Sequence, residues 1–178
     1  MSKEYFDLLD EFGNKIGKTK LRSKVHRDGD WHKGVHIWVI NNDNDILLQR
    51  RCATKDSNPN MLDISSAGHL QAGDSSQEAA IRELKEELDL DVTKDELIFI
   101  ETIKNSLRYT ETFINNEFDD VYIVRTNKKI DEMKFQKEKI SEIMYIPYNE
   151  FKKMVNNRQP DLLVRDKDFE ILFSYLNK

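Results

Sequence analysis

Three acidic side chains in one short segment offer the clearest chemistry in this sequence. Arg82 is followed directly by Glu83, and Glu86 and Glu87 come within the next four residues. On a helix with about 100° per residue, the three acids share roughly a 100° arc. Like charges this close repel one another and destabilise a helix. Mg²⁺ or Mn²⁺, which prefer carboxylate oxygens, would relieve that repulsion. The pattern alone also fits a solvated acidic face, which is the commoner case.

The helix that carries these acids is expected to begin near Ser76, because Ser75 or Ser76 is a suitable N-cap. Arg82 is spaced to pair with Glu86 at i,i+4. Gly68, ahead of the helix, allows the backbone to approach a metal or phosphate closely. A core-facing stripe lies next to the acidic arc and consists of Ala80, Ile81, Leu84 and Leu88.

Residues 68–90 resemble the Nudix box, a family signature that reads G-x5-E-x7-R-E-U-x-E-E-x-G-U with U a bulky aliphatic residue. The chain has Gly68, the run 82–88 and Leu90 at their places. Asp74 stands where Glu is usual and keeps the carboxylate. Asp89 stands where Gly is usual, and Asp tolerates left-handed backbone geometry better than most residues.

The resemblance implies an α/β fold, a sandwich of helices around a mixed sheet, and a MutT-like hydrolase that cleaves a diphosphate linkage in a nucleoside diphosphate-X or related small molecule. It implies Mg²⁺ or Mn²⁺ held by Glu83, Glu86 and Glu87, with Gly68 beside the metal. Glu83, Glu86 and Arg82 would be the catalytic residues. The general base would be a carboxylate of this set or of residues 115–120.

A narrower resemblance is to the Nudix subgroup that includes type-I isopentenyl-diphosphate isomerase. It covers an N-terminal hairpin, an Arg-Arg pair followed by a lysine, and a Gly-His pair. Three histidines and two acids hold a metal in the isomerase. His26, His32 and His69 stand at or near the equivalent places, and the candidate acids are Glu117, Asp119 and Asp120.

The isomerase has a cysteine acid directly before its Gly-His pair, where this chain has Ala67. The isomerase reaction is therefore expected to be absent, although it stays an alternative. A non-catalytic diphosphate-binding sensor is a third reading, supported by the departures at Asp74 and Asp89. We expect the hydrolase.

Substrate phosphates are expected to bind Arg51 and Lys55, with His69 also at the site, because arginine suits bidentate phosphate contacts. His36 lies inside an apolar strand pattern and is expected to pack. Four aromatic residues could stack on a base, although strand positions are more typical of core: Trp31, Trp38, Phe118 and Tyr122.

The remaining pattern predicts strands and helices in mixed order. The expected strands are 5–9 and 16–20 as a hairpin, 35–40 and 46–51 as a central hairpin, 96–104, 109–114 and 118–125 around a turn at 115–117, and 143–146. Residues 62–65 are expected to approach the helix that carries the acids. The expected helices are 21–26, one with Pro147 at N1 that runs through 155, and 166–176. We expect one domain over residues 1–178, with an extension at 1–32, a core at 33–156 and a C-terminal helix within 157–178.

Composition narrows the class of protein. The 178 residues are 38% hydrophobic and 34% charged, with a net charge of −5. Without a basic block, binding to a nucleic-acid polymer is not expected. One cysteine, Cys52, and no apolar run near the ~20 residues of a membrane span favour a cytoplasmic protein without membrane contact. The expected partner is a small-molecule diphosphate, and a homodimer stays open.

Overall fold

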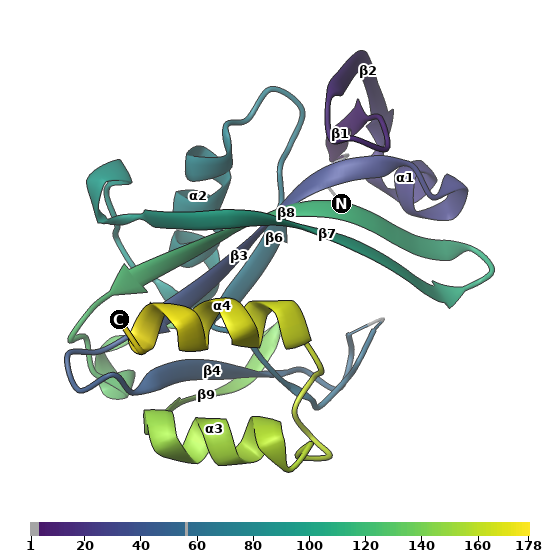
Figure 1. The fold of residues 1–178 in the computed structure, drawn as a ribbon. Helices are drawn as coiled ribbons and strands as arrows, with labels where there is room; N and C mark the ends of the chain where they lie inside the picture. Colours follow the sequence, from purple (N-terminus) through teal and green to yellow (C-terminus); the bar gives the residue numbers. More distant parts are fainter. Residues whose placement is uncertain (1–3, 56) are drawn as a thin grey trace.

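The computed structural model describes residues 4–55 and 57–178 and gathers their strands into one mixed sheet (Figure 1). The strands are β1 (Tyr5–Leu9), β2 (Lys15–Leu21), β3 (Trp31–Ile40), β4 (Ile46–Arg51), β5 (Leu62–Asp63), β6 (Ser66–His69), β7 (Ile98–Thr110), β8 (Phe113–Arg125) and β9 (Ile140–Ile146). The helices are α1 (Arg22–Asp28), α2 (Ser76–Leu88), α3 (Tyr148–Asn156) and α4 (Asp166–Leu176), with short 3₁₀ turns η1 (Lys94–Glu96) and η2 (Ile130–Glu132). No helix in the described ranges is long and apolar enough to cross a membrane.

Strand β3 is the centre of the sheet, and its two faces carry separate cores. It runs parallel to β8 from Trp31↔Asn116 to Ile40↔Arg125. Because side chains alternate along a strand, Val35 and Val39 face α2 and pack with Leu84. Trp38 faces the other side and packs with Phe151 of α3 and Phe169 of α4. The predicted α/β class and the sandwich around a mixed sheet are confirmed (Figure 1).

The predicted central hairpin of β3 and β4 holds only at its turn. The two strands share the register pair Ile40↔Ile46 and then separate. Along the rest of its length β3 pairs with β6, from Gly34↔His69 to Ile37↔Ser66, while β4 pairs with β9. The inserted strand β6 therefore brings Gly68 and His69 beside the centre of the sheet.

The predicted turn at 115–117 is wrong. Strand β8 passes straight through these residues, and the chain reverses at Glu111 and Thr112 instead. The polar side chains that suggested a turn have partners inside the fold: the Asn116 side-chain amide donates to the Gly29 carbonyl at 2.7 Å, and Asn115 donates to Glu117. The long β7–β8 hairpin extends beyond the sandwich and forms part of the pocket described below (Figure 1).

Local signals at the helix ends were read correctly, with one shift. Ser75 caps α2 and forms a capping box with Glu78, and Asp89 ends the helix in the left-handed region at φ 52°. The predicted helix 166–176 has the bounds of α4. Pro147 is the N-cap of α3 and not its first helical residue. The division into extension, core and C-terminal helix stays a prediction, and residues 1–3 of the extension lie outside the described ranges.

Candidate active site

A pocket of about 350 Å³ opens where α2, β6, the β7–β8 hairpin and the first strand of the N-terminal hairpin meet. Its lining is mostly charged, with acids from α2 and cations from several other segments. Of the residues named above as candidates for the site, those that line it are Gly68, Arg82, Glu83, Glu86, Glu87, Arg51, Lys55, His69, His26, Glu117 and Asp119. Asp74, His32 and Asp120 are outside this lining set.

The acids of α2 differ in their exposure and partners. Glu83 and Glu87 are buried, and Glu86 is exposed. Glu83 Oε1 accepts from Arg82 Nη1 at 2.6 Å, and Glu87 Oε2 accepts from Ser66 Oγ at 2.8 Å. Each carboxylate therefore keeps one oxygen free of hydrogen bonds to described residues. Burial, together with the charge of Glu87, raises the pKa of Glu83.

Gly68 accounts for the position of Glu83. A Cβ at Gly68 would overlap Cδ and Cγ of the Glu83 side chain, so only glycine leaves room for this carboxylate against β6. Two buried carboxylates held apart from bulk water, with free oxygens on one side, form an oxygen donor set that suits Mg²⁺ or Mn²⁺. The residues present therefore fit a hard divalent cation.

Arg82 does not form the predicted ion pair with Glu86. Besides its bond to Glu83, Arg82 Nη2 donates to the His69 carbonyl at 3.0 Å and to Asp74 Oδ2 at 3.4 Å. Its guanidinium therefore joins α2 to the end of β6 and to the following turn. The acceptors of Nη2, on His69 and Asp74, come from other segments of the chain, which a helix-spacing rule does not consider.

The three histidines lie together, and His26 and His69 of this cluster line the pocket. Ligand atoms of His26, His32 and His69 all lie within 4.8 Å of one another. Glu117 Oε1 lies 2.8 Å from His69 Nε2 and 3.3 Å from His32 Nε2. Both ring nitrogens of His26 are buried without a hydrogen-bond partner among the described residues.

The surroundings favour a neutral His26 and an ionised Glu117 in this cluster. Burial, and then the neighbouring His69 and His32, lower the pKa of His26 to about 3. Burial opposes ionisation of Glu117, but the adjacent imidazoles of His32 and His69 hold its pKa well below the usual value. Neutral imidazoles with one carboxylate suit a transition metal such as Zn²⁺ or Mn²⁺, so this cluster also fits a metal.

The three candidate acids on β8 point to different faces. Glu117 lies at the histidines, and Asp119 lines the pocket, where it accepts from Asn105 Nδ2 at 2.8 Å. Asp120 faces the α2 side, where it accepts from Thr102 Oγ1 at 2.6 Å and pairs with Lys33 at 2.8 Å. The prediction that Asp120 belongs to the site is therefore corrected in favour of Asp119, because neighbouring residues on a strand alternate between faces.

His36 was expected to pack, and the structure instead places it in a buried polar network at the pocket. Its Nδ1 lies 2.8 Å from Asp168 Oδ1 and its Nε2 lies 3.1 Å from Arg165 Nη1. Burial alone would lower the pKa of His36, but Asp119 and Asp168 outweigh it and raise the pKa to about 9. Asp168 is 132 residues away along the chain, so no local signal in the sequence could reveal the pair.

The cations of the pocket are not equally free. Arg51 Nη1 donates to Asp63 Oδ2 at 3.2 Å, and its Nε donates to the Ser57 carbonyl at 3.2 Å. Lys55 has no ion-pair or hydrogen-bond partner for its ammonium among the described residues, and burial lowers its pKa. Lys139, which sequence reasoning missed, also lines the pocket. Lys55 is therefore better placed than Arg51 to bind an incoming anion.

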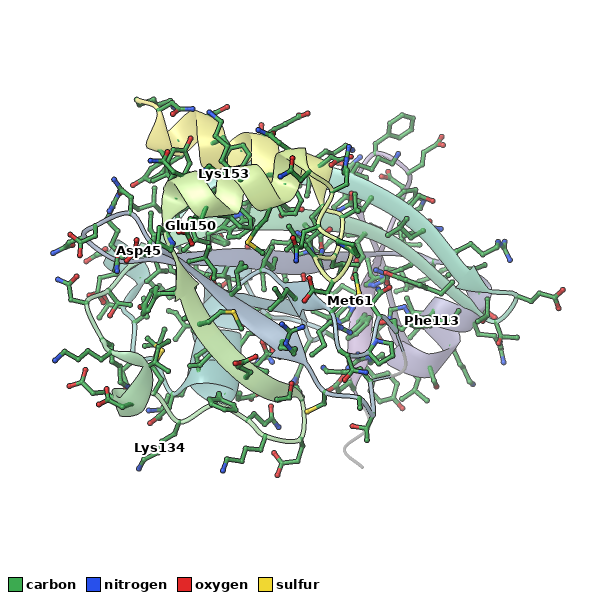
Figure 2. The ribbon with its side chains drawn as sticks, turned by 90° about the horizontal axis from the view of Figure 1, so that it is seen from below. Asp45, Met61, Phe113, Lys134, Glu150 and Lys153 are labelled. Carbon is green, nitrogen blue, oxygen red and sulfur yellow. The ribbon has the colours of Figure 1, made fainter. Side chains whose placement is uncertain are left out.

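The four aromatic residues suggested for base stacking do not line the pocket. Trp38 and Tyr122 are core residues, and Trp31 packs on Phe118 with ring centroids 5.1 Å apart. The apolar residues that do line it are Phe6, Ala67, Leu107, Tyr109 and Phe113. Figure 2 shows Phe113 at the end of the molecule formed by the β7–β8 hairpin.

Comparison with known proteins identifies relatives of this chain. The chain is 42% identical over 175 residues to Nudix hydrolase 3 of Arabidopsis thaliana, which covers 96% of this chain and 22% of the plant protein. It is 28% identical over 162 residues to isopentenyl-diphosphate Delta-isomerase 2 of Photorhabdus laumondii, covering 89% and 85% of the two chains.

The fold also matches the crystal structure of DR0079 from Deinococcus radiodurans, with a TM-score of 0.69 and 22% identity over 94% of this chain and 97% of that one. The family model of the NUDIX domain matches residues 30–165. With a match over most of its length and a plant Nudix hydrolase as a relative, the chain belongs to the Nudix family.

Proposed function

We propose that the protein hydrolyses a diphosphate linkage in a small molecule, either a nucleoside diphosphate-X or a related diphosphate, with Mg²⁺ or Mn²⁺. The observation that carries the proposal is the pair of free carboxylate oxygens on Glu83 and Glu87, which face the pocket beside Gly68. A diphosphate repels hydroxide, so a site that cleaves it has to neutralise charge.

In this proposal the buried Glu83 and Glu87 hold the metal, and the exposed Glu86 beside them acts as the general base. A bound divalent cation would polarise phosphate oxygens and lower the pKa of a bound water. Arg82 holds Glu83 in position through its 2.6 Å hydrogen bond. The absence of a side chain at Gly68 gives Glu83 its place against β6.

The other charged residues of the pocket would bind the substrate and take the proton. Lys55 contacts a phosphate, while Arg51 holds the loop that carries Ser57 and supplies a second positive charge. Glu86 is exposed and has no ion pair to described residues. It accepts a proton from the attacking water while the oxygen of that water bonds to phosphorus. The bridging P–O bond breaks, and two phosphate-bearing products leave.

A metal-supplemented hydrolysis screen tests this function. The panel comprises nucleoside, sugar-nucleotide, coenzyme and isoprenoid diphosphates, each with Mg²⁺, with Mn²⁺ and with chelator, and phosphate-bearing products are measured. We expect metal-dependent cleavage of at least one class. Tight binding without cleavage over the whole panel would instead favour a diphosphate-binding sensor.

A second candidate is isomerisation of isopentenyl diphosphate, which the cluster of His26, His32, His69 and Glu117 favours. Against it, Ala67 cannot donate or accept a proton. Incubation with isopentenyl diphosphate, Mg²⁺ and Mn²⁺, followed by NMR, should show no dimethylallyl diphosphate. Formation of that product by the wild-type protein would make the isomerase the better assignment.

A further inference from the structure

Lys139 is fixed next to the carboxylates of α2 although it comes from a distant segment. Its backbone N–H donates to the Gln136 carbonyl at 2.9 Å, and its carbonyl accepts from the backbone N–H of Cys52 at 3.0 Å. Gln136 in turn donates its N–H to the Glu87 carbonyl at 3.0 Å. The segment before β9 is therefore tied both to α2 and to the end of β4, and the base of the Lys139 side chain has a defined position.

The free oxygens of the two buried acids face this lysine. Glu83 Oε2 lies 4.0 Å from Lys139 Nζ, and Glu87 Oε1 lies 3.6 Å from it. These are the oxygens that Arg82 and Ser66 leave unbonded. The ammonium therefore lies toward the atoms that the proposed function assigns to the metal.

Both distances exceed those of a direct N–H···O hydrogen bond, and the Lys139 side chain keeps 33% of its surface exposed. The contact is thus electrostatic and adaptable. A lysine ammonium on a four-carbon stem can move several ångströms while its backbone stays in place. A divalent cation between the same oxygens would repel the ammonium at this range.

We propose that Lys139 is the resident counter-ion of the carboxylate site, and that its ammonium transfers to a phosphate of the substrate when a divalent cation occupies the site. The inference rests on the proposed function and adds a residue to it. In the metal-free protein the lysine offsets the repulsion between Glu83 and Glu87. In the loaded protein it joins Lys55 on the anionic substrate, since both line the same pocket.

Two binding measurements test the exchange. Mn²⁺ binding is measured by titration calorimetry on the wild type and on Lys139→Met, which keeps the length of the chain and removes the charge. Because a partly exposed ion pair is lost, we expect the variant to bind Mn²⁺ roughly fivefold more tightly. Lys134→Met is the charge-matched control: Lys134 is exposed and points away from the protein in Figure 2, so its Mn²⁺ affinity should equal that of the wild type.

The second measurement uses methylenediphosphonate, a non-hydrolysable diphosphate, at saturating Mn²⁺. Lys139→Met should bind it roughly fivefold more weakly, and Lys139→Arg should restore binding. If thermal unfolding shows that Lys139→Met is not folded, both titrations are carried out on Lys139→Gln instead. Mn²⁺ affinity in Lys139→Met that is equal to or below that of the wild type would overturn the counter-ion role. A wild type that binds no Mn²⁺ would overturn the proposed function itself.

Discussion

Gly68 and Glu83 occupy adjoining space so closely that a methyl group on Gly68 would overlap the Glu83 carboxylate carbon. The glycine is in β6 and pairs with Val35 of β3, so the backbone there cannot easily withdraw. The absence of a side chain at Gly68 therefore leaves the space that the Glu83 carboxylate occupies. This relationship gives the glycine of the Nudix box a specific task in this chain.

Substitution of this glycine should separate folding from metal binding. The methyl group of Gly68→Ala would displace the Glu83 side chain, so we expect Mn²⁺ affinity to fall roughly tenfold to 100-fold. Overpacking of this kind also costs about 1–3 kcal/mol of stability. Calorimetric Mn²⁺ titration and circular dichroism check the two effects. Ala72→Ser adds an atom at an exposed position just after β6 and is the control, so it should change neither the Mn²⁺ affinity nor the stability. Unaltered Mn²⁺ affinity in Gly68→Ala would show that Gly68 does not position the Glu83 carboxylate.

The pair of His36 and Asp168 should make stability depend on pH. The pKa of His36 is raised from 6.5 to about 9 in the folded protein, so its contribution is complete below pH 6.5 and is lost as pH rises through about 9. Asp168→Asn removes one partner of a buried ion pair, which costs about 3 kcal/mol at pH 6. The cost should shrink by pH 10.

Urea unfolding at pH 6 and pH 10 measures this difference. Asp166→Asn is the matched control on the same helix, because Asp166 is exposed and pairs with the exposed Arg158. We expect the control to lose at most about 1 kcal/mol at either pH. An equal cost of Asp168→Asn at both pH values would show that a charged His36 is not what Asp168 stabilises.

The histidine cluster should bind a transition metal independently of α2. Co²⁺ added to the protein should give visible absorption bands and raise the unfolding temperature. The pKa of His26 is lowered to about 3, so its imidazole is still neutral at pH 5.5, and the pKa of His69 is also lowered from its usual value. Protons therefore compete less with the metal here than at free imidazoles, and Co²⁺ binding should persist at pH 5.5.

Two variants locate the Co²⁺ signal. His32→Asn should abolish it, because the substitution removes one imidazole of the cluster. Glu87→Gln should leave it in place, since Glu87 lies outside the cluster. A signal that survives His32→Asn would place the Co²⁺ elsewhere.

Local sequence signals predicted the features that depend on neighbouring residues. The N-cap at Ser75, the left-handed Asp89 and the full extent of α4 are set by residues within a few positions of one another. Helix caps and helix periodicity are local, so they can be read from one sequence. The grouping of the α2 acids followed for the same reason.

Pairings between distant segments could not be read in this way. Strand β6 separates β3 from β4 over most of their length, and no local pattern in the sequence of either strand predicts this insertion. The choice between Asp119 and Asp120 depends on strand register, and a shift of one residue reverses the face. Arg165 and Lys139 reach the pocket only through the tertiary fold, and resemblance to the Nudix box covers neither.

The account depends most on Glu87. Hydrolysis of the best substrate from the diphosphate panel is compared in the wild type, in Glu87→Gln and in Glu138→Gln, which changes an exposed glutamate outside the pocket. Loss of a metal-binding carboxylate should lower Mg²⁺-dependent turnover by more than about 100-fold in Glu87→Gln, while its circular dichroism spectrum stays that of the wild type and Glu138→Gln keeps full activity. Wild-type turnover in Glu87→Gln would contradict the assignment of the metal to α2.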